Sequence, residues 1–550
     1  MLPNPLDTDV IIVGGGPAGL MLANELGRRG VGVVLFDQDA ATAVNPQANA
    51  TQARTMEHYR RLGFADEVRA QGLPPDYPTD IAYYTTFAGH ELARFRLPSA
   101  AEAKDMVRHL SGSWSAAELP HRVSQMYVER VLHRHAAALP TVSLRYRHSV
   151  TAVADHGAHV TATAQGPEGD VSATGRYLVG CDGARSIVRQ HLGLRYEGES
   201  GVERDFVGGA MHAVYLRSAH IYDAFAGSPA WMNVNISHRR RSFFIAVDGR
   251  SEFVFHTQLK PGEDRDAISE TQARTMFAEC MGRPVDFEIL SRTSWTAGFT
   301  LVAERLQEGR LFLAGDAAHL FTPTGGLGYN TAIEDAVNLG WKLAAMVNGW
   351  GGGALPASYH AERHPAAVRN TGYARGFAES LGGFRATAAL ETAGPAGDAA
   401  RATASAYFDR HGRTEFNIPG ITFGTRYDNS PAIVSDGSAP PPDRANAYVP
   451  TACPGGRAPH LWLAGDVSLF DRFGFEFTLL RLGGARNTDA LEAAARQARL
   501  PLTVVDLAGA EARDLYAADY VLIRPDQTVA WRGSVTGNPA RVIDTVRGAA

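Results

Sequence analysis

A glycine-rich segment near the N-terminus constrains the fold more than any other feature of this chain. The β-branched run from Val10 to Val13 is followed at once by Gly14-x-Gly16-x-x-Gly19 and then by a helical pattern. In such a unit the first glycine permits a tight turn, the second lets a pyrophosphate approach the backbone, and the third allows close helix–strand packing. The helix N-terminus adds free N–H groups for the phosphates. We therefore expect a dinucleotide-binding βαβ unit.

The residues around this turn are the first cofactor-binding candidates. A second buried-strand pattern from Val31 to Phe36 ends in Asp37, near the position about 20 residues on whose carboxylate binds ribose hydroxyls. An ordinary glycine-rich turn, with Asp37 merely closing a strand, is the alternative. The candidates in this unit are Gly14, Gly16, Pro17, Ala18, Gly19, Asp37 and Gln38.

Length and charge limit the other possibilities. A chain of 550 residues exceeds a single hydrophobic core, so we expect two or three domains. The formal net charge of -5, without a long run of one sign, gives no electrostatic reason to expect nucleic acid or an anionic membrane as partner. The apolar run from Val10 to Ala23 is shorter than the roughly 20 residues that span a bilayer. We expect neither partner.

The cysteines indicate the compartment and exclude some chemistry. Cys181, Cys280 and Cys453 are odd in number and scattered, which argues against a disulfide framework, a zinc site and dithiol redox chemistry. The N-terminus also lacks the basic region of a signal peptide. We expect no metal and a cytoplasmic location.

Two further turns combine glycine with an acid after a strand-like run. Asp182-Gly183 follows the run 177–179, and Gly315-Asp316 follows the run 311–314. Later in the chain, the glycine-rich loop from Pro323 to Asn330 precedes a helical pattern in which Thr331 and Glu334 have capping-box spacing. A turn or a plain link between elements is the alternative at each place.

Three of these motifs, the glycine fingerprint at Gly14, the Asp182-Gly183 turn and the Gly315-Asp316 turn, occur in this order. Together they resemble the motifs of the single-component flavoprotein aromatic hydroxylases, the group A FAD-dependent monooxygenases. The resemblance runs from about Val10 to Arg363. It implies FAD as cofactor, NADPH or NADH as transient reductant, and O₂ with a small aromatic molecule as substrates. The implied reaction is hydroxylation of a phenolic or polycyclic aromatic ring through a C4a-hydroperoxyflavin. Baeyer–Villiger-type oxygenation on the same fold and a non-catalytic FAD-fold binding protein stay open.

The resemblance also implies roles for residues of this sequence. Asp316 would bind the ribityl chain, Asp182 would lie near the pyrophosphate, and the loop N–H groups would meet the N1 and C2 carbonyl edge of the flavin. The catalytic candidates are Pro323 and Gly325. Many members carry an arginine where Gln47 stands here, and Arg54 is expected to supply part of that role. The remaining cofactor-binding candidates are Arg54, Gln125, Asp182, Gly183, Gly315, Asp316, Gly326, Gly328, Tyr329 and Asn330.

A separate sheet is predicted by strand-like runs at 206–216, 231–236, 242–247 and 252–259. Because successive side chains of a strand alternate between faces, residues of one parity should form the wall of a substrate pocket. Plain core packing is the alternative for each. The pocket candidates are Trp231, Asn233, Asn235, Phe244 and Phe253, and the candidates for assisting phenol deprotonation are His256, Tyr222 and His238.

The C-terminal tail alternates strand and helix patterns after the proline run 440–442. It resembles the thioredoxin-like domain of the phenol-hydroxylase branch but lacks the redox cysteine pair, so we expect a structural or dimer-supporting role and name a homodimer as a candidate assembly.

The expected fold class of the chain is α/β, a Rossmann-like FAD-binding domain interleaved with a β-sheet substrate domain. The expected division is 1–75, 111–200 and 296–390 for FAD, 76–110 and 201–295 for the substrate sheet, 391–440 for a helical and loop linker, and 441–550 for the thioredoxin-like domain.

Overall fold

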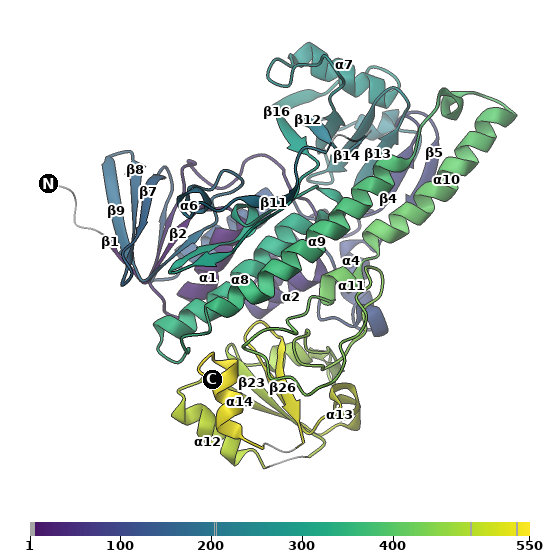
Figure 1. The fold of residues 1–550 in the computed structure, drawn as a ribbon. Coiled ribbons are helices and arrows are strands. Elements are labelled where there is room, and N and C mark those ends of the chain that lie inside the picture. The colour runs from purple at the N-terminus through teal and green to yellow at the C-terminus, as the bar shows by residue number, and fades with distance from the viewer. Residues whose placement is uncertain (1–5, 203, 205, 485–486, 535–536) are drawn as a thin grey trace.

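The computed structural model describes residues 6–202, 204, 206–484, 487–534 and 537–550 (Figure 1). Its first domain is built on a six-stranded sheet in the order β18-β19-β10-β2-β3-β6, parallel except at β18. The glycine-acid turns follow β2, β10 and β19, which are neighbours, so their carboxyl ends lie together. The strands are β2 Val10–Val13, β3 Val33–Phe36, β6 Val142–Arg145, β10 Tyr177–Gly180, β18 Gln307–Glu308 and β19 Leu311–Leu313.

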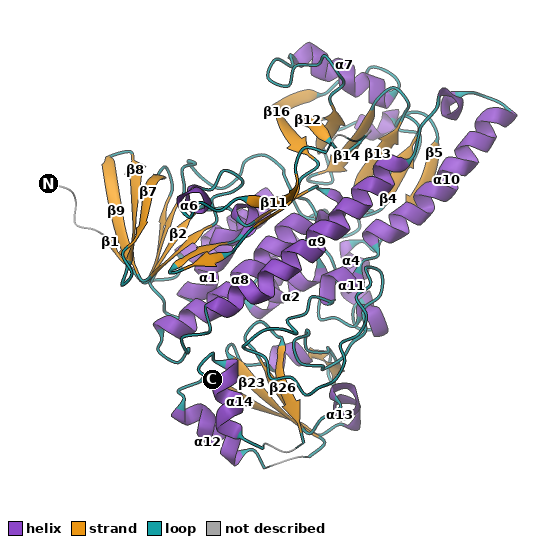
Figure 2. Cartoon of the chain, viewed as in Figure 1, coloured by secondary structure: helices purple, strands orange, loops and turns teal. Residues whose placement is uncertain are grey.

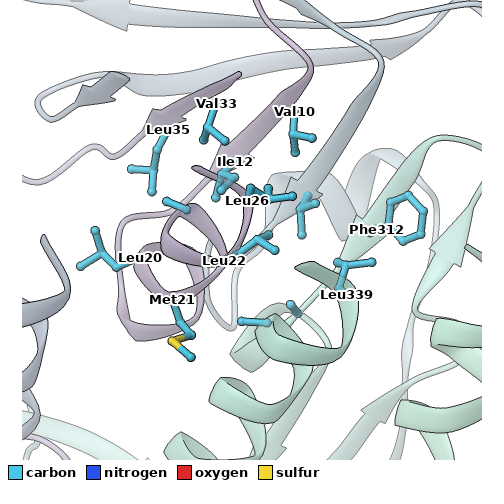
Figure 3. Close-up of a cluster of buried hydrophobic side chains, with 14 of the residues drawn as sticks. Val10, Ile12, Leu20, Met21, Leu22, Leu26, Val33, Leu35, Phe312 and Leu339 are labelled. Carbon is cyan, nitrogen blue, oxygen red and sulfur yellow. The ribbon is translucent and has the colours of Figure 1, made fainter. Parts of the chain in front are cut away.

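The core of this domain forms where helix α1 (Pro17–Gly27) packs between the sheet and helix α8 (Leu327–Val347). Figure 3 shows Ile12, Leu22 and Leu339 among the side chains that fill this space, and all three are buried. Every side chain of β2 and β3 is buried, as expected for parallel strands covered on both faces. The Rossmann-like unit predicted from the sequence is confirmed.

Two smaller sheets complete the domain. One has the order β1-β9-β8-β7 and the other β11-β17-β20. Their strands are β1 Leu6–Asp7, β7 Ser149–Asp155, β8 Val160–Gly166, β9 Gly169–Gly175, β11 Tyr196–Glu199, β17 Thr300–Ala303 and β20 His319–Phe321. Short helices around them are α2 Ala53–Arg61, α3 Ala65–Ala70, α5 Gln125–Ala137 and α6 Ile187–His191.

The second domain is a seven-stranded sheet in the order β16-β12-β15-β14-β13-β4-β5. All its neighbours are antiparallel except β13 and β4. Helix α7 (Glu270–Met281) packs on one face, which we call the outer face; the inner face is the other one. The strands are β4 Ile81–Tyr84, β5 Glu91–Phe95, β12 Gly209–Arg217, β13 Met232–Ile236, β14 Arg241–Ala246, β15 Glu252–Gln258 and β16 Glu288–Ala297, with helix α4 at Ala100–Met106.

Two long helices join the domains, as Figure 2 shows. Helix α9 (Ala357–Gly383) runs from the first domain to the second beside α8, and α10 (Pro395–Phe416) returns along β5. Helix α10 falls in the segment expected to be a linker. It is followed by the short helix α11 (Pro419–Phe423).

The C-terminal domain has a four-stranded sheet in the order β24-β23-β25-β26 (Figure 1). Only β23 and β24 are parallel. Its elements are β23 Phe477–Leu482, β24 Leu502–Leu507, β25 Tyr520–Ile523, β26 Val529–Gly533, α12 Asp489–Gln497, α13 Ala510–Tyr516 and α14 Pro539–Val546, with β21 Trp462–Leu463 and β22 Val467–Ser468 preceding them. Among the described residues, no helix is long and apolar enough to cross a bilayer.

Candidate active site

The first glycine turn is shaped by close backbone approaches. Gly14 has φ +105, and a Cβ there would lie 2.2 Å from the carbonyl oxygen of Cys181; at Gly19 it would lie 1.9 Å from that of Gly14. These two glycines therefore bring the strands and helix together. At Gly16, the residue before α1, no atom of the described chain lies within 4 Å of a Cβ position. The turn thus leaves an open space at the helix N-terminus, where an anion is favoured.

Asp37 ends β3 and turns back toward this glycine loop. Its Oδ2 accepts a hydrogen bond from the backbone N–H of Gly15 at 2.5 Å, and its Oδ1 accepts one from Asp39 at 2.7 Å. Burial raises the pKa of the carboxyl. Gln38, the next residue, is exposed. The placement of Asp37 beside the loop suits a ribose ligand, which such a carboxylate can hold at its free lone pairs.

The second turn places Asp182 at the start of α6. Its Oδ2 accepts hydrogen bonds from the N–H groups of Ile187 and Val188 at 2.7 and 3.4 Å, while its Oδ1 is buried without a partner. Burial raises the pKa of this carboxyl. Gly183 has φ +76, and no atom of the described chain lies within 4 Å of a Cβ there. Asp182 is therefore partly used in capping a helix, and the open backbone beside it is at Gly183.

The arginine after this turn is already engaged. Arg189 donates hydrogen bonds to the hydroxyl of Tyr196 at 2.7 Å and to the carbonyl of Ala184 at 2.9 Å. Its guanidinium also stacks over the Tyr196 ring at 3.9 Å. Arg189 therefore holds the turn in place and is not available for a nicotinamide phosphate, whereas Arg185 is exposed.

Asp316, in the third turn, has an unusual combination of properties. Surrounding protein raises the pKa of its carboxyl through desolvation, with His319 opposing, yet the residue is exposed. A group can be both only if it lies in a recess rather than on a convex surface. No hydrogen bond to its carboxylate is found within the described chain. Gly315, before it, has φ +62 and a Cβ there would lie 3.1 Å from Ala18, so the third turn packs directly on α1.

A buried charge network that the sequence analysis missed fixes this third turn. Asp335 of α8 accepts hydrogen bonds from the Gly315 N–H at 3.2 Å and from Arg363 at 2.8 Å, and its Oδ2 lies 2.7 Å from His319 Nε2. Burial alone would raise the pKa of Asp335, but His319 and Arg363 lower it. An acid in the middle of an apolar helix is the only sequence hint of this role.

The loop before α8 is held on both sides. Gly325 and Gly326 both have left-handed backbones, with φ +69 and +61. A Cβ at Gly325 would lie 3.0 Å from Phe377 of α9, and one at Gly326 would lie 3.1 Å from Ala50. Pro323 precedes this turn, and Gly328 packs at 3.4 Å from Phe321 by the same measure. These close approaches explain why glycine recurs through the loop.

Asn330 and Tyr329 contact residues in and just before α2, and Asn330 also donates a hydrogen bond back to the carbonyl of Gly326 at 2.7 Å. The Asn330 side chain accepts hydrogen bonds from the Gln52 N–H and the Thr55 hydroxyl at 2.8 and 2.7 Å, and donates to the carbonyl of Ala50 at 3.0 Å. Tyr329 shares a hydroxyl contact with Tyr59 of α2. Both were expected to bind cofactor. In the described chain they link α8 to α2, and their cofactor role stays a prediction.

Two other expected cofactor residues also have protein partners. Gln125 donates to Glu129 at 2.8 Å, and its backbone N–H donates to Ala48 at 2.7 Å, so it anchors the segment before α2. Arg54 is buried and donates to Gln527 at 2.7 Å and to the carbonyl of Asp526 at 2.6 Å. Its guanidinium therefore binds the C-terminal domain, and the cofactor role expected from its sequence position stays a prediction.

The residues expected to form the substrate pocket lie mainly on the outer face. The Phe244 ring packs 5.8 Å from Phe277 of α7. Asn235 donates to the carbonyls of Thr85 and Cys280 at 2.8 and 3.3 Å, and Cys280 is also in α7. These side chains are enclosed between the sheet and the helix.

Two of the other three candidates, Asn233 and Phe253, follow the same pattern. Asn233 donates to the carbonyl of Ala230 at 3.3 Å, and the Phe253 ring stacks on Phe244 at 4.8 Å. Trp231 precedes β13 and lies 3.9 Å under the guanidinium of Arg122. The parity expected from the sequence is therefore off by one residue. Because β13 is buried along its whole length, no alternation of polarity revealed which face was which.

The inner face meets the FAD-binding part of the chain. Val254 and Ile245 pack with Met126 and Tyr127 of α5. His256 lies on the same face, paired with Ala213. His256 and its neighbours Phe243 and Trp295 are partly exposed. We define the inner-face residues as Ala213, Phe243, Ile245, Val254, His256 and Trp295.

Two nitrogen atoms on the inner face have no hydrogen-bonding partner in the described chain. They are Nδ1 of His256 and Nε1 of Trp295, whose rings meet edge to face at 5.8 Å. Burial lowers the pKa of His256 to about 4, so its ring is neutral near pH 7. The other two residues considered for phenol deprotonation lie elsewhere: Tyr222 packs on Phe253 of the outer face and His238 beside Glu391.

These features fit an FAD molecule. The open backbone at Gly16 and Gly183 suits a pyrophosphate, Asp37 suits a ribose, and the recessed carboxylate of Asp316 suits a polyol. A large ligand that supplies donors would also offset the desolvation of Asp316. The donor set thus matches a dinucleotide with a sugar-alcohol chain.

Comparison with known proteins decides the family. Residues 7–373 match the FAD binding domain, and residues 451–550 match the aromatic-ring hydroxylase C-terminal domain. The chain belongs to the FAD-dependent aromatic-ring hydroxylases. It is a monooxygenase that binds FAD, and its family uses NAD(P)H as reductant.

Relatives and solved structures cover the whole chain. A Streptomyces halstedii protein, whose name assigns it to the polyketide hydroxylases, is 31% identical over 95% of this chain and 93% of its own. The 4-methyl-5-nitrocatechol 5-monooxygenase of a Burkholderia species is 30% identical over 96% and 95%.

Among solved structures, RebC with bound 7-carboxy-K252c has a TM-score of 0.89 and 31% identity over 99% of this chain and 100% of that one. The flavin-dependent monooxygenase PieE, in complex with FAD and substrate, has a TM-score of 0.88 and 28% identity with the same coverage. The hydroxylase family and FAD, expected from the sequence, are confirmed.

Proposed function

We propose that this hydroxylase acts on an electron-rich aromatic substrate of several fused rings that carries phenol or enol oxygens. The inner face supports this substrate class by its width. Its residues come from β14, β15, β12 and β16, and four strands span about 14 Å at the usual strand spacing. One aromatic ring occupies about one strand spacing, so this surface suits several rings. The polyketide hydroxylase name of one relative agrees with this size.

The observation that carries the proposal is the pair of unpartnered nitrogens on the inner face. A buried polar atom without a hydrogen bond costs on the order of 1–3 kcal/mol, a cost that a bound ligand with matching atoms removes. Trp295 Nε1 can only donate, and neutral His256 can accept through its unprotonated nitrogen. A phenol or enol oxygen with its proton satisfies both atoms.

The inner-face residues would then have separate roles toward the substrate. His256 accepts a hydrogen bond from the phenolic O–H at its ring nitrogen, which makes the substrate ring richer in electrons. Trp295 donates a hydrogen bond to an oxygen and fixes which ring carbon is presented. The apolar side chains of Phe243, Ile245 and Val254 exclude water from the site, which protects the activated oxygen from unproductive decay. FAD, when bound, supplies the acceptance of hydride and the activation of O₂.

The cofactor residues are part of the same proposal. We place the pyrophosphate at Gly16 and Gly183, a ribose at Asp37 and the ribityl chain at Asp316, supported by the open and recessed positions at these residues. We also propose a cytoplasmic location, supported by three free cysteines. The four-part domain division and a homodimer stay predictions, the second of which light scattering tests.

The test combines product analysis with two conservative substitutions. Incubation with NADPH, ¹⁸O₂ and a panel of phenols and polycyclic hydroxyarenes should give products heavier by one ¹⁸O atom, with the polycyclic members turned over best. Trp295→Phe and His256→Phe should consume NADPH but release more hydrogen peroxide per product. Trp462→Phe is the matched control, because its indole donates to Val107 far from the inner face.

Other outcomes would overturn the proposal. Ring expansion of a ketone to an ester would favour Baeyer–Villiger chemistry, and bound flavin that NAD(P)H never bleaches would favour a binding protein. Selective turnover of monocyclic phenols would overturn the proposed substrate class.

A further inference from the structure

Glu415, near the end of α10, contacts the glycine loop directly. Its Oε1 accepts a hydrogen bond from the backbone N–H of Gly325 at 2.8 Å. A backbone N–H carries one proton, so this group is committed to a carboxylate of the protein. Gly325 belongs to the loop that the resemblance places at the flavin edge. Its N–H group is therefore hydrogen-bonded to a side chain 90 residues later in the chain.

A second buried side chain lies beside the carboxylate of Glu415. His411, one turn earlier in α10, places Nε2 2.9 Å from Glu415 Oε2, and its Nδ1 lies 2.9 Å from the hydroxyl of Ser380 in α9. The side chains of His411 and Glu415 are only 1% and 6% exposed. Glu415 is therefore buried, with Oε1 hydrogen-bonded to the glycine loop and Oε2 beside the ring of His411.

Gly325 is held from its other sides as well. Its carbonyl accepts a hydrogen bond from the side chain of Gln52 at 3.3 Å, and Phe377 closes the space beside its Cα. Its left-handed backbone is thus specified by contacts from α9, α10 and the segment before α2. Of the three side chains that contact Gly325, those of Gln52, Phe377 and Glu415, only that of Glu415 is ionisable.

The same cluster reaches the substrate sheet. Tyr83 of β4, paired with Val234, packs its ring 4.9 Å from Phe408 and 6.1 Å from His411. Burial, with a contribution from the charge of Glu415, raises the pKa of Tyr83 well above its usual range. Helix α10 therefore connects the sheet to the flavin loop through buried groups.

We propose that Glu415, through its hydrogen bond to Gly325, is a positioning residue that holds the conformation of the flavin loop and brings a negative charge close to the flavin site. That charge opposes the negative charge of reduced flavin and so lowers the reduction potential. The inference rests on FAD binding by this family and not on the proposed substrate.

The experiment uses the FAD-loaded enzyme without aromatic substrate. Glu415→Gln keeps the shape and an oxygen that can accept from Gly325, but removes the charge, so the flavin midpoint potential should rise while the FAD dissociation constant stays within about twofold. Glu415→Ala also removes the acceptor and should raise that constant roughly tenfold. Asp409→Asn, on the exposed side of α10, is the charge-matched control and should change neither value.

An unchanged midpoint potential in Glu415→Gln would overturn the electrostatic part of the proposal. An unchanged FAD dissociation constant in Glu415→Ala would overturn the positioning part. The isosteric Gln variant keeps the test valid if the Ala variant does not fold. Because neither measurement involves the aromatic substrate, both are independent of the substrate assignment.

Discussion

The FAD-binding domain has two interfaces of opposite character. Toward the C-terminal domain, buried charges meet partners: Glu362 binds Arg524 at 2.7 and 2.8 Å and Lys342 at 2.7 Å, and Arg457 binds Glu57. A cavity here holds only about 30 Å³, enough for water but not for a ligand.

Toward the substrate sheet, polar atoms lack partners. Asp316 lies in a recess without a hydrogen bond from the described chain, and His256 and Trp295 each leave a nitrogen unpartnered. The contrast teaches how to tell a structural polar interface from a ligand site. The charged groups of the first interface have protein partners that offset their desolvation, whereas the carboxylate of Asp316 has none in the described chain and a ligand must supply it; single neutral atoms, such as His58 Nδ1, are unpartnered on the first side as well.

The largest expected effect is a loss of stability at the interface between the FAD-binding domain and the C-terminal domain. Glu362→Ala leaves Lys342 without a carboxylate and Arg524 with Asp526 alone, and breaking such a buried pair costs about 3–5 kcal/mol. Thermal unfolding followed by tryptophan fluorescence should show a marked drop in the first transition. Exposed Glu308→Ala is the control. A variant as stable as the wild type would show that the ion pairs do not hold the domains together.

The two faces of the substrate sheet provide the next comparison. Phe244→Ala opens a cavity under α7 and should cost about 3–5 kcal/mol of stability while leaving the coupling of NADPH use to product nearly unchanged. Ile245→Ala, one residue on, should cost less stability and lower the coupling. Chemical denaturation and the ratio of product to NADPH consumed measure both effects. The reverse pattern would restore the parity expected from the sequence.

At Asp316, a substitution should weaken FAD binding and leave the stability of the fold unchanged. Asp316→Ala removes a carboxylate with no protein partner, so the unfolding temperature of the apoprotein should not fall. A lost charged hydrogen bond to FAD is worth about 1.5–3 kcal/mol, which weakens binding at least roughly tenfold. Titration with FAD, followed by quenching of its fluorescence, measures this. Destabilised apoprotein with unchanged FAD affinity would contradict the contrast.

The smallest effect concerns pH. Burial lowers the pKa of Lys342 to about 8, below its unfolded value near 10.4. Between these values the unfolded chain binds more protons, so stability should rise with pH from about 8 to 10 through this group. Lys342→Met should remove that rise and leave Arg524 paired with Glu362. Unfolding temperatures across this pH range, compared with the wild type, would reveal it; identical slopes would refute the assignment.

Much of the fold could be predicted because its determinants are local. The strand, turn and helix around Gly14 lie within 20 residues of chain, and the left-handed or crowded glycines leave little choice of residue. The turns at Asp182 and Asp316 follow buried strands in the same way, so the resemblance identified the family from their order alone. Asp335, in contrast, looks like an ordinary helix residue until Arg363 and His319 surround it.

By itself, the sequence determined the dinucleotide-binding unit and the existence of a second sheet, since short-range backbone sterics and strand patterns encode them, while FAD as the cofactor followed from the resemblance to a family. Only the tertiary structure decided which face of that sheet meets the FAD-binding domain, because strands buried on both sides carry no polarity alternation. It also decided the partners of Arg54 and Gly325. A charge or an N–H group binds whatever the fold brings near, and those partners, Gln527 and Glu415, lie far along the chain.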